Sequence, residues 1–202
     1  MSRKRRRTAS TPSGQVRIIG GDWRRRTLGF PAVDDVRPTP DRVRETLFNW
    51  LADEVPGARC LDLFAGSGAL GLEALSRGAQ SVVFVDSSRS LTRALKANLG
   101  TLGASNAEIR TMDVLAFLKG EVPQQTFEMV FLDPPFRQGW IEPLCTMLSV
   151  GAWVGPGSWI YLEHEKELDN PPVPAQWHLS RRKTAGQVAY SLFEVQEAGR
   201  SA

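Results

Sequence analysis

The sequence is short of the residues on which several classes of protein depend. Its 202 residues include two cysteines and two histidines. Cys60 and Cys145 are too few for a disulfide framework, so we expect a reducing, cytoplasmic location. His164 and His178 lie apart from each other and lack the spacing of metal ligands. We therefore expect no metal site.

Long apolar segments are also missing. No run approaches the roughly 20 residues that a membrane helix needs. The N-terminus is polar and basic, without the apolar region of a secretory signal. Hydrophobic residues make up 42% of the chain and charged residues 23%, which supports a sizeable core and excludes global disorder. We expect one ordinary domain with a short appendage and no membrane partner.

Positive charge is concentrated at the start of the chain. Residues 1–26 hold nine basic side chains and one acid, whereas the rest of the chain holds 16 basic and 21 acidic residues. A basic arm on a mildly acidic body indicates a polyanionic partner, because arginine-rich segments gain affinity by releasing counterions from phosphates. The alternative for the run that ends at Arg7 is a solvated tail that aids solubility.

The chain divides into three parts. Residues 1–14 are basic and have nothing to bury, so we expect a disordered tail. Residues 15–36 are predicted to form an arginine-rich β-hairpin extension, with a strand over Val16–Ile19, a turn at residues 20–22 and a returning strand over Trp23–Phe30. Residues 37–198 form the main domain. Its first helix is predicted to follow a Thr39 cap, with Pro40 in the first helical position.

From about residue 58 the pattern alternates between strands and helices. Five apolar strands are expected, each followed by a helix or loop, which predicts a parallel sheet with helices on both faces. The expected strands cover residues 59–64, 81–85, 107–110, 127–132 and 159–163. The last part of the chain, residues 177–195, alternates around a turn and is predicted to be a terminal antiparallel hairpin. The fold class is therefore α/β.

A glycine-rich loop follows the first of these strands. Gly66, Gly68 and Gly71 match the spacing G-x-G-x-x-G, and Asp86 ends the next strand twenty residues after Gly66. Glycines allow a ligand to approach the backbone, and an acid at that position accepts hydrogen bonds from ribose hydroxyls. This pattern favours a nucleoside cofactor over a purely structural turn. It does not distinguish a nicotinamide cofactor from S-adenosylmethionine.

The segment Asp133-Pro134-Pro135-Phe136 favours S-adenosylmethionine. It follows the fourth strand, at the edge where ligands bind in open α/β sheets. The exocyclic amine of a base is a poor nucleophile because its lone pair is delocalised. The Asp133 carboxylate and the Pro134 carbonyl can accept its two N–H groups, and Phe136 can stack on the base. The alternative is an ordinary polar loop.

Four motifs together resemble a known family. They are Arg17-Ile18-Ile19-Gly20-Gly21, the segment from Arg37 to Leu51, the glycine loop and the Asp133 motif. With them the chain resembles the bacterial small-subunit rRNA guanine-N2 methyltransferases of the RsmD type. The resemblance implies a class I methyltransferase fold, S-adenosylmethionine as the methyl donor, and N2 methylation of a guanosine in 16S rRNA of the assembled or assembling small subunit.

The resemblance also assigns site residues. It implies cofactor contacts at Thr39, Asp62, Gly66, Ser67, Gly68, Asp86 and Asp113, catalytic roles for Asp133, Pro134, Pro135 and Phe136, and RNA contacts at Arg17, Arg24, Arg25 and Arg26. Asp113 is equally well suited to cap the helix that begins at Val114. The family usually has Arg-Gly-Arg in the hairpin, and arginine replaces that glycine at position 25 here.

Three other functions compete with this assignment. Enzymes that methylate N6 of adenine in DNA or RNA use the same Asp-Pro-Pro-aromatic motif, and only the family resemblance argues against this function. A nicotinamide oxidoreductase would need a substrate domain and a proton donor. A non-catalytic rRNA-binding assembly factor would not need the intact Asp133 motif. We expect a monomeric enzyme. Arg181, Arg182 and Lys183 are consistent with either an RNA-binding face or a solvated strand edge.

Overall fold

The computed structural model describes residues 14–31, 33, 39–120 and 122–197. The expected disordered tail lies almost wholly outside these residues, as does Arg37. The strands are β1 (Gly14–Arg17), β2 (Thr27–Phe30), β3 (Arg59–Leu63), β4 (Ser81–Asp86), β5 (Ala107–Thr111), β6 (Met129–Leu132), β7 (Trp159–Glu165), β8 (Trp177–Ala185) and β9 (Val188–Val195). The helices are α1 (Asp41–Trp50), α2 (Ala69–Ser76), α3 (Arg89–Leu102), α4 (Val114–Gly120) and α5 (Ile141–Val150).

Seven of the strands form one sheet in the order β5-β4-β3-β6-β7-β9-β8. The strands from β5 to β7 in this order are parallel, and β9 pairs antiparallel with both β7 and β8. This arrangement confirms the expected α/β fold with a mostly parallel sheet and a terminal antiparallel hairpin. Strand order reverses between β3 and β6, which makes their carboxyl ends the place where a ligand is expected.

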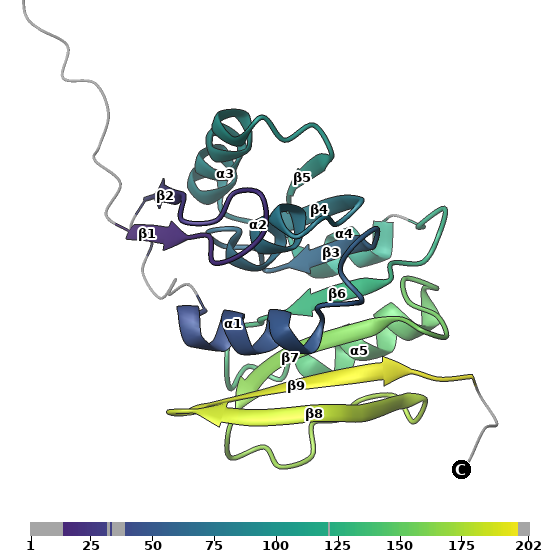
Figure 1. The fold of residues 1–202 in the computed structure, drawn as a ribbon. Coiled ribbons are helices and arrows are strands. Elements are labelled where there is room, and N and C mark those ends of the chain that lie inside the picture. Colours follow the sequence, from purple (N-terminus) through teal and green to yellow (C-terminus); the bar gives the residue numbers. More distant parts are fainter. Residues whose placement is uncertain (1–13, 32, 34–38, 121, 198–202) are drawn as a thin grey trace, which may run out of the picture.

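Helices cover both faces of the sheet (Figure 1). Apolar side chains of α1, α2 and α3 pack on one face, and those of α4 and α5 pack on the other. Side chains alternate between these layers along each strand. On β3, Cys60 belongs to the first layer, whereas Leu61 and Leu63 belong to the second. Within the described residues, no helix has the length and apolar character needed to cross a membrane.

The N-terminal hairpin is shorter than expected and its loop is longer. β1 pairs antiparallel with β2, from Gly14 opposite Phe30 to Arg17 opposite Thr27. Gly14 therefore lies in a strand, not in the tail. The predicted tight turn at residues 20–22 is wrong, because the turn lies at residues 22–25. The Ile19 and Gly20 amides bond to Glu73 on α2, and Ile18 bonds across the hairpin to Arg25 and Arg26. Val16, Ile18, Leu28 and Phe30 are buried in the first layer.

The start of α1 also differs from the prediction. Pro40, not Thr39, occupies the N-cap position, and no side chain caps the helix. The Thr39 hydroxyl donates to Oε1 of Glu163, 2.8 Å away on β7. Thr39 therefore links the segment before α1 to the carboxyl edge of the sheet.

Candidate active site

The two motif loops begin side by side in the sheet. Leu63 at the end of β3 is paired with Leu132 at the end of β6, so the residues that follow, Phe64 and Asp133, leave the sheet at the same level. The glycine loop and the Asp133 motif therefore flank the point where the strand order reverses. The structure thus brings the two predicted motifs together.

The glycine loop contains positive φ angles, which residues other than glycine rarely adopt. Gly66 and Gly68 have φ values of 55° and 78°, and the non-glycine Phe64 has a φ of 62°. At Gly71, on α2, an added Cβ would lie 2.2 Å from the Phe84 ring and 2.9 Å from an Asp62 carboxylate oxygen. Glycine is therefore required at position 71 for close packing of α2 on the sheet.

Two predicted acids hold this loop. Oδ2 of Asp62 accepts from the Gly71 amide at 2.9 Å, and Oδ2 of Asp86 accepts from the Gly66 amide at 2.8 Å. Asp86 also accepts from the Ser88 amide through its other oxygen. The amides of Gly66 and Gly71 are thus already bonded to these carboxylates. Neither acid has a cationic partner among the described side chains.

Burial changes the acidity of Asp62. Its side chain is 2% exposed. Loss of solvation, with a smaller contribution from the negative charge of Asp86, raises the pKa of Asp62 to about 7, although the Gly71 hydrogen bond opposes the rise. A cation near Asp62 would restore its usual acidity.

Asp113 caps a helix. Its Oδ1 accepts from the Ala116 amide at 2.9 Å, which is the bond of an N-cap residue at the start of α4. The side chain is exposed at the end of β5. The capping role predicted for Asp113 is confirmed, and its contact with a cofactor stays a prediction.

The Asp133 motif borders a pocket of about 240 Å³. Pro134, Pro135 and Phe136 line it on one side, together with Trp140 at the start of α5 and Glu163 on β7. Phe136 is 37% exposed, so its ring is available to a planar ligand. Trp140 is held by an edge-on contact with Phe64, with ring centroids 5.8 Å apart. The pocket combines aromatic walls with a buried acid.

Glu163 stands beside Asp133, and sequence analysis did not identify it. Leu132 at the end of β6 pairs with Leu162, so Asp133, which follows β6, lies next to Glu163 on β7. Oε1 of Glu163 accepts from the Thr39 hydroxyl at 2.8 Å and from the Tyr161 hydroxyl at 2.9 Å. An acid directly after the apolar run from Trp159 to Leu162 is the sequence signal that could have found it.

The pKa of Asp133 is raised well above its usual value. Burial is the main cause, and the negative charges of Glu163 and Asp62 add to it. Burial also raises the pKa of Glu163, against the lowering effect of the two hydroxyl donors. The carboxyl edge of the sheet therefore holds three acids, the buried Asp62 and Glu163 and the half-buried Asp133, that have no cationic partner among the described residues.

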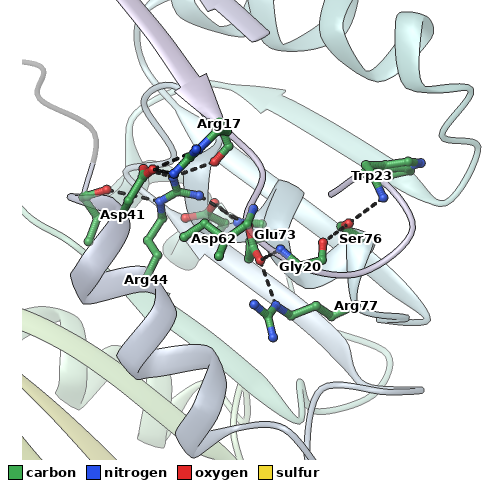
Figure 2. Close-up of polar contacts among 12 residues, drawn as sticks. Arg17, Gly20, Trp23, Asp41, Arg44, Asp62, Glu73, Ser76 and Arg77 are labelled. Atoms are coloured by element: carbon green, nitrogen blue, oxygen red, sulfur yellow. Dashed lines mark hydrogen bonds and ion pairs between the residues drawn. The ribbon is translucent and has the colours of Figure 1, made fainter. Parts of the chain in front are cut away.

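The N-terminal loop is fixed to α2 by Glu73 (Figure 2). This carboxylate accepts from the amides of Ile19 and Gly20, both at 2.8 Å, and pairs with the guanidinium groups of Arg44 and Arg77. Glu73 is fully buried. It was also absent from the sequence-based site, because its backbone partners, Ile19 and Gly20, are distant in the chain.

A second contact, through Ser76, holds the same loop. The Ser76 hydroxyl donates to the Gly20 carbonyl and accepts from the Trp23 amide (Figure 2). At Gly21, with a φ of 72°, an added Cβ would lie 1.7 Å from the Ser76 carbonyl oxygen. The close approach of this backbone to α2 therefore requires glycine at position 21.

The predicted RNA-binding arginines fall into two groups. Arg17 donates to Oδ2 of Asp41 at 3.0 Å, so its guanidinium already has an acidic partner. Arg24, Arg25 and Arg26 are exposed in the loop before β2, and no acidic partner is recorded for them among the described residues. Arg25 has a φ of 69°. It keeps the left-handed geometry for which glycine is better suited.

Comparison with known proteins places these features in a family. A family model described as "Conserved hypothetical protein 95" matches residues 16–194. Ribosomal RNA small subunit methyltransferase D of Escherichia coli (strain K12) is 48% identical over 189 residues, which cover 94% of each chain. The protein of the same name from Haemophilus influenzae is 45% identical and covers 90% of this chain and 94% of its own.

Solved structures agree with the sequence comparison. One, described as the putative methyltransferase yhhF from Escherichia coli, has a TM-score of 0.82 and 47% identity, covering 91% of this chain and 99% of its own. A methyltransferase structure complexed with SAH shares the fold, with a TM-score of 0.67 and 14% identity, and covers 84% of this chain and 53% of its own. Because the family model and the relatives span nine-tenths of its length, the chain belongs to the RsmD family, and its fold is that of the class I methyltransferases.

Proposed function

We propose that this protein transfers a methyl group from S-adenosylmethionine to the exocyclic N2 of a guanosine in 16S rRNA. The substrate is the assembled or assembling small ribosomal subunit, and the enzyme acts as a monomer. Membership of a family whose curated members are named small-subunit rRNA methyltransferases supports this assignment. The observation that carries it is the half-buried Asp133 at the point of strand reversal, followed by two prolines and an exposed phenylalanine.

The residues at the ends of β3 and β4 fit S-adenosylmethionine. The glycine loop of Gly66, Ser67 and Gly68 would receive the methionine part, with Asp62 near its ammonium group and Asp86 near the ribose. The cofactor supplies an activated methyl group on a cationic sulfur. Its positive charges match the acids Asp62 and Asp86, which have no cationic partner among the described residues. Thr39 and Asp113 would complete the site, near the cofactor and its adenine.

The Asp133 motif would orient the amine. The Asp133 carboxylate and the Pro134 carbonyl each accept one N–H of the guanine N2 group, which holds the nitrogen in line with the donated carbon. Phe136 stacks on the base. As the nitrogen acquires positive charge, the Asp133 carboxylate is the nearest acceptor for its proton. Burial raises the pKa of Asp133 and so strengthens it as a base.

Replacement of Asp133 tests this assignment. We expect Asp133→Asn to lower kcat for methyl transfer to unmethylated small subunits by at least about 100-fold, because one hydrogen-bond acceptor and the base are removed together. Binding of S-adenosylmethionine, measured by calorimetry, should change little. Asp53→Asn is the matched control, because Asp53 is an exposed acid that follows the C-terminus of α1. Full activity of Asp133→Asn would refute the role of Asp133, and N6-methyladenosine in the mass-mapped product would refute the choice of guanine.

The exposed arginines of the N-terminal loop are proposed to contact the RNA backbone. Replacing Arg24, Arg25 and Arg26 together by glutamine should raise the KM for small subunits and reduce the dependence of binding on salt. The slope of log affinity against log salt should fall by about one for each phosphate that the variant no longer neutralises. An unchanged KM and slope would exclude this loop as an RNA-binding element.

A further inference from the structure

The pocket beside the Asp133 motif contains an acceptor that methyl transfer at an exocyclic amine does not itself require. Glu163 is 5% exposed and lines this pocket with Pro134 and Phe136. It is the neighbour of Asp133 across β6 and β7. A buried carboxylate without a cationic partner is costly, so its place at this pocket calls for a function.

Two hydroxyl groups fix the direction of the Glu163 carboxylate. Thr39 and Tyr161 both donate to the same oxygen, Oε1. The Tyr161 side chain is fully buried, so this arrangement is held by the core. The second oxygen, Oε2, therefore remains as an acceptor for a ligand in the pocket.

Guanine and adenine differ in what they present to such an acceptor. On its Watson–Crick edge guanine carries N1–H beside its N2 amine, so two adjacent positions donate hydrogen bonds. Adenine carries an unprotonated N1 beside its N6 amine, and the lone pair of that nitrogen would face the carboxylate. With the amine held at Asp133 and Pro134, a second carboxylate next to Asp133 accepts from guanine and repels adenine.

We propose that Glu163 is the specificity-determining residue of this site and accepts the N1–H of the target guanine through Oε2. Thr39 and Tyr161 are positioning residues that hold the carboxylate in this direction. The inference rests on the proposed function, because it identifies the base edge that the same pocket recognises. It supplies a physical reason for guanine instead of adenine that the Asp-Pro-Pro-Phe motif alone does not contain.

The test uses a base that keeps the reacting amine and lacks N1–H. Once mass mapping has located the methylated guanosine, 2,6-diaminopurine ribonucleoside is placed at that position by ligation of the rRNA. This base has the same 2-amino group but an unprotonated N1. We compare kcat/KM for the two substrates with the full-length enzyme, its Glu163→Gln variant and a Glu165→Gln variant. Glu165 is the matched control because it lies two residues further along β7 and lines the same pocket.

We expect the wild-type enzyme to prefer guanosine by about tenfold or more, the effect of one hydrogen bond to a charged group. In Glu163→Gln the ratio should fall towards one, because the glutamine amide can turn to donate to an unprotonated N1. Glu165→Gln should keep the wild-type ratio. A wild-type ratio in Glu163→Gln, or an equal loss on both substrates, would overturn the proposal.

Failure of the proposed function would be recognised separately. In that case the mass mapping that precedes this comparison would find no N2-methylguanosine. If Glu163→Gln does not fold, Tyr161→Phe carries the test. This variant removes one of the two donors to Oε1 and should lower the ratio severalfold with the S-adenosylmethionine affinity unchanged. An unchanged ratio in a folded Tyr161→Phe enzyme would also overturn the proposal.

Discussion

Glu73 and two acids at the carboxyl edge of the sheet, Asp62 and Glu163, are buried to a similar degree but have different partners. Glu73 accepts two backbone amides and pairs with two guanidinium groups, those of Arg44 and Arg77. Asp62 and Glu163 are 2% and 5% exposed, and the partners recorded for them are uncharged: an amide for Asp62 and two hydroxyls for Glu163. Glu73 is therefore neutralised by arginines of the protein itself, whereas Asp62 and Glu163 are not.

The difference separates a structural role from a functional one. A buried carboxylate that is paired and fully hydrogen-bonded holds two segments together, as Glu73 holds the N-terminal loop on α2. Unpaired buried acids reduce the stability of the folded chain, and such groups are typical of sites that receive a ligand. The unpaired acids, Asp62 and Glu163, suit a cationic cofactor and the hydrogen-bond donors of a guanine, respectively.

Among the substitutions, removing the Glu73 charge should produce the largest loss of stability. Glu73→Gln leaves the buried guanidinium of Arg44 without its partner on α2, and we expect the free energy of unfolding to fall by about 3 kcal/mol. Asp41, 2.7 Å from Arg44, keeps the loss from being larger. Urea unfolding gives the value, and limited proteolysis should show earlier cleavage within residues 18–26.

An exposed acid on α1 provides the control for this prediction. Glu45→Gln should change the free energy of unfolding by less than about 0.5 kcal/mol. If Glu73→Gln were as stable as Glu45→Gln, neutralisation of Glu73 would not be what fixes the loop. The contrast between the paired Glu73 and the unpaired Asp62 and Glu163 would then not hold.

Asp62, an acid without a cationic partner, predicts that the stability of the protein depends on pH. The pKa of Asp62 is about 7 in the folded chain and 3.8 in the unfolded chain, so between these values the folded state holds more protons. The stability of the ligand-free protein should therefore decrease as pH rises from about 4 to 7, by up to roughly 4 kcal/mol from this group. Urea unfolding at several pH values measures the change.

Asp62→Asn isolates the contribution of this side chain. Asparagine resembles the protonated acid, so the variant should be more stable than the wild type at pH 8, and the two should converge near pH 4. S-adenosylmethionine, which is cationic, should then stabilise the wild type more than the variant. A stability difference that did not vary with pH would show that Asp62 is not an unpaired charge.

The local sequence pattern was sufficient for the sheet and for the two motif loops. Strands alternate with helices as expected, and the Asp133 motif follows the strand next to β3. The positions of Glu73 and Glu163 could not be predicted in the same way. Glu73 lies in a helix whose residues are all buried, and its backbone partners are more than 50 residues earlier in the chain. Glu163 depends on Thr39, 124 residues away. Long-range polar contacts of this kind leave no local periodicity.

The boundaries of the N-terminal hairpin were wrong for the same reason. Ile18 and Ile19 have the composition of a strand. The Ile19 amide bonds instead to the Glu73 carboxylate, so pairing between β1 and β2 stops earlier than the apolar residues do. Competition from a buried charge on another element overrides the local preference.

The smallest effect should come from the backbone of the same docked loop. Arg25 has a φ of 69°, a conformation that costs a non-glycine residue about 1 kcal/mol or more. Arg25→Gly should therefore raise the free energy of unfolding by about 0.5–1 kcal/mol, after the greater flexibility of glycine in the unfolded chain is subtracted.

Arg24→Gly is the matched change at a neighbouring exposed arginine without a positive φ, and it should lower the free energy of unfolding by about 0.5 kcal/mol. Opposite signs for the two variants would show that backbone strain, not removal of charge, limits the stability of the loop. If both variants were destabilised equally, charge would be the cause. The loop would then be held by its arginines as well as by Glu73.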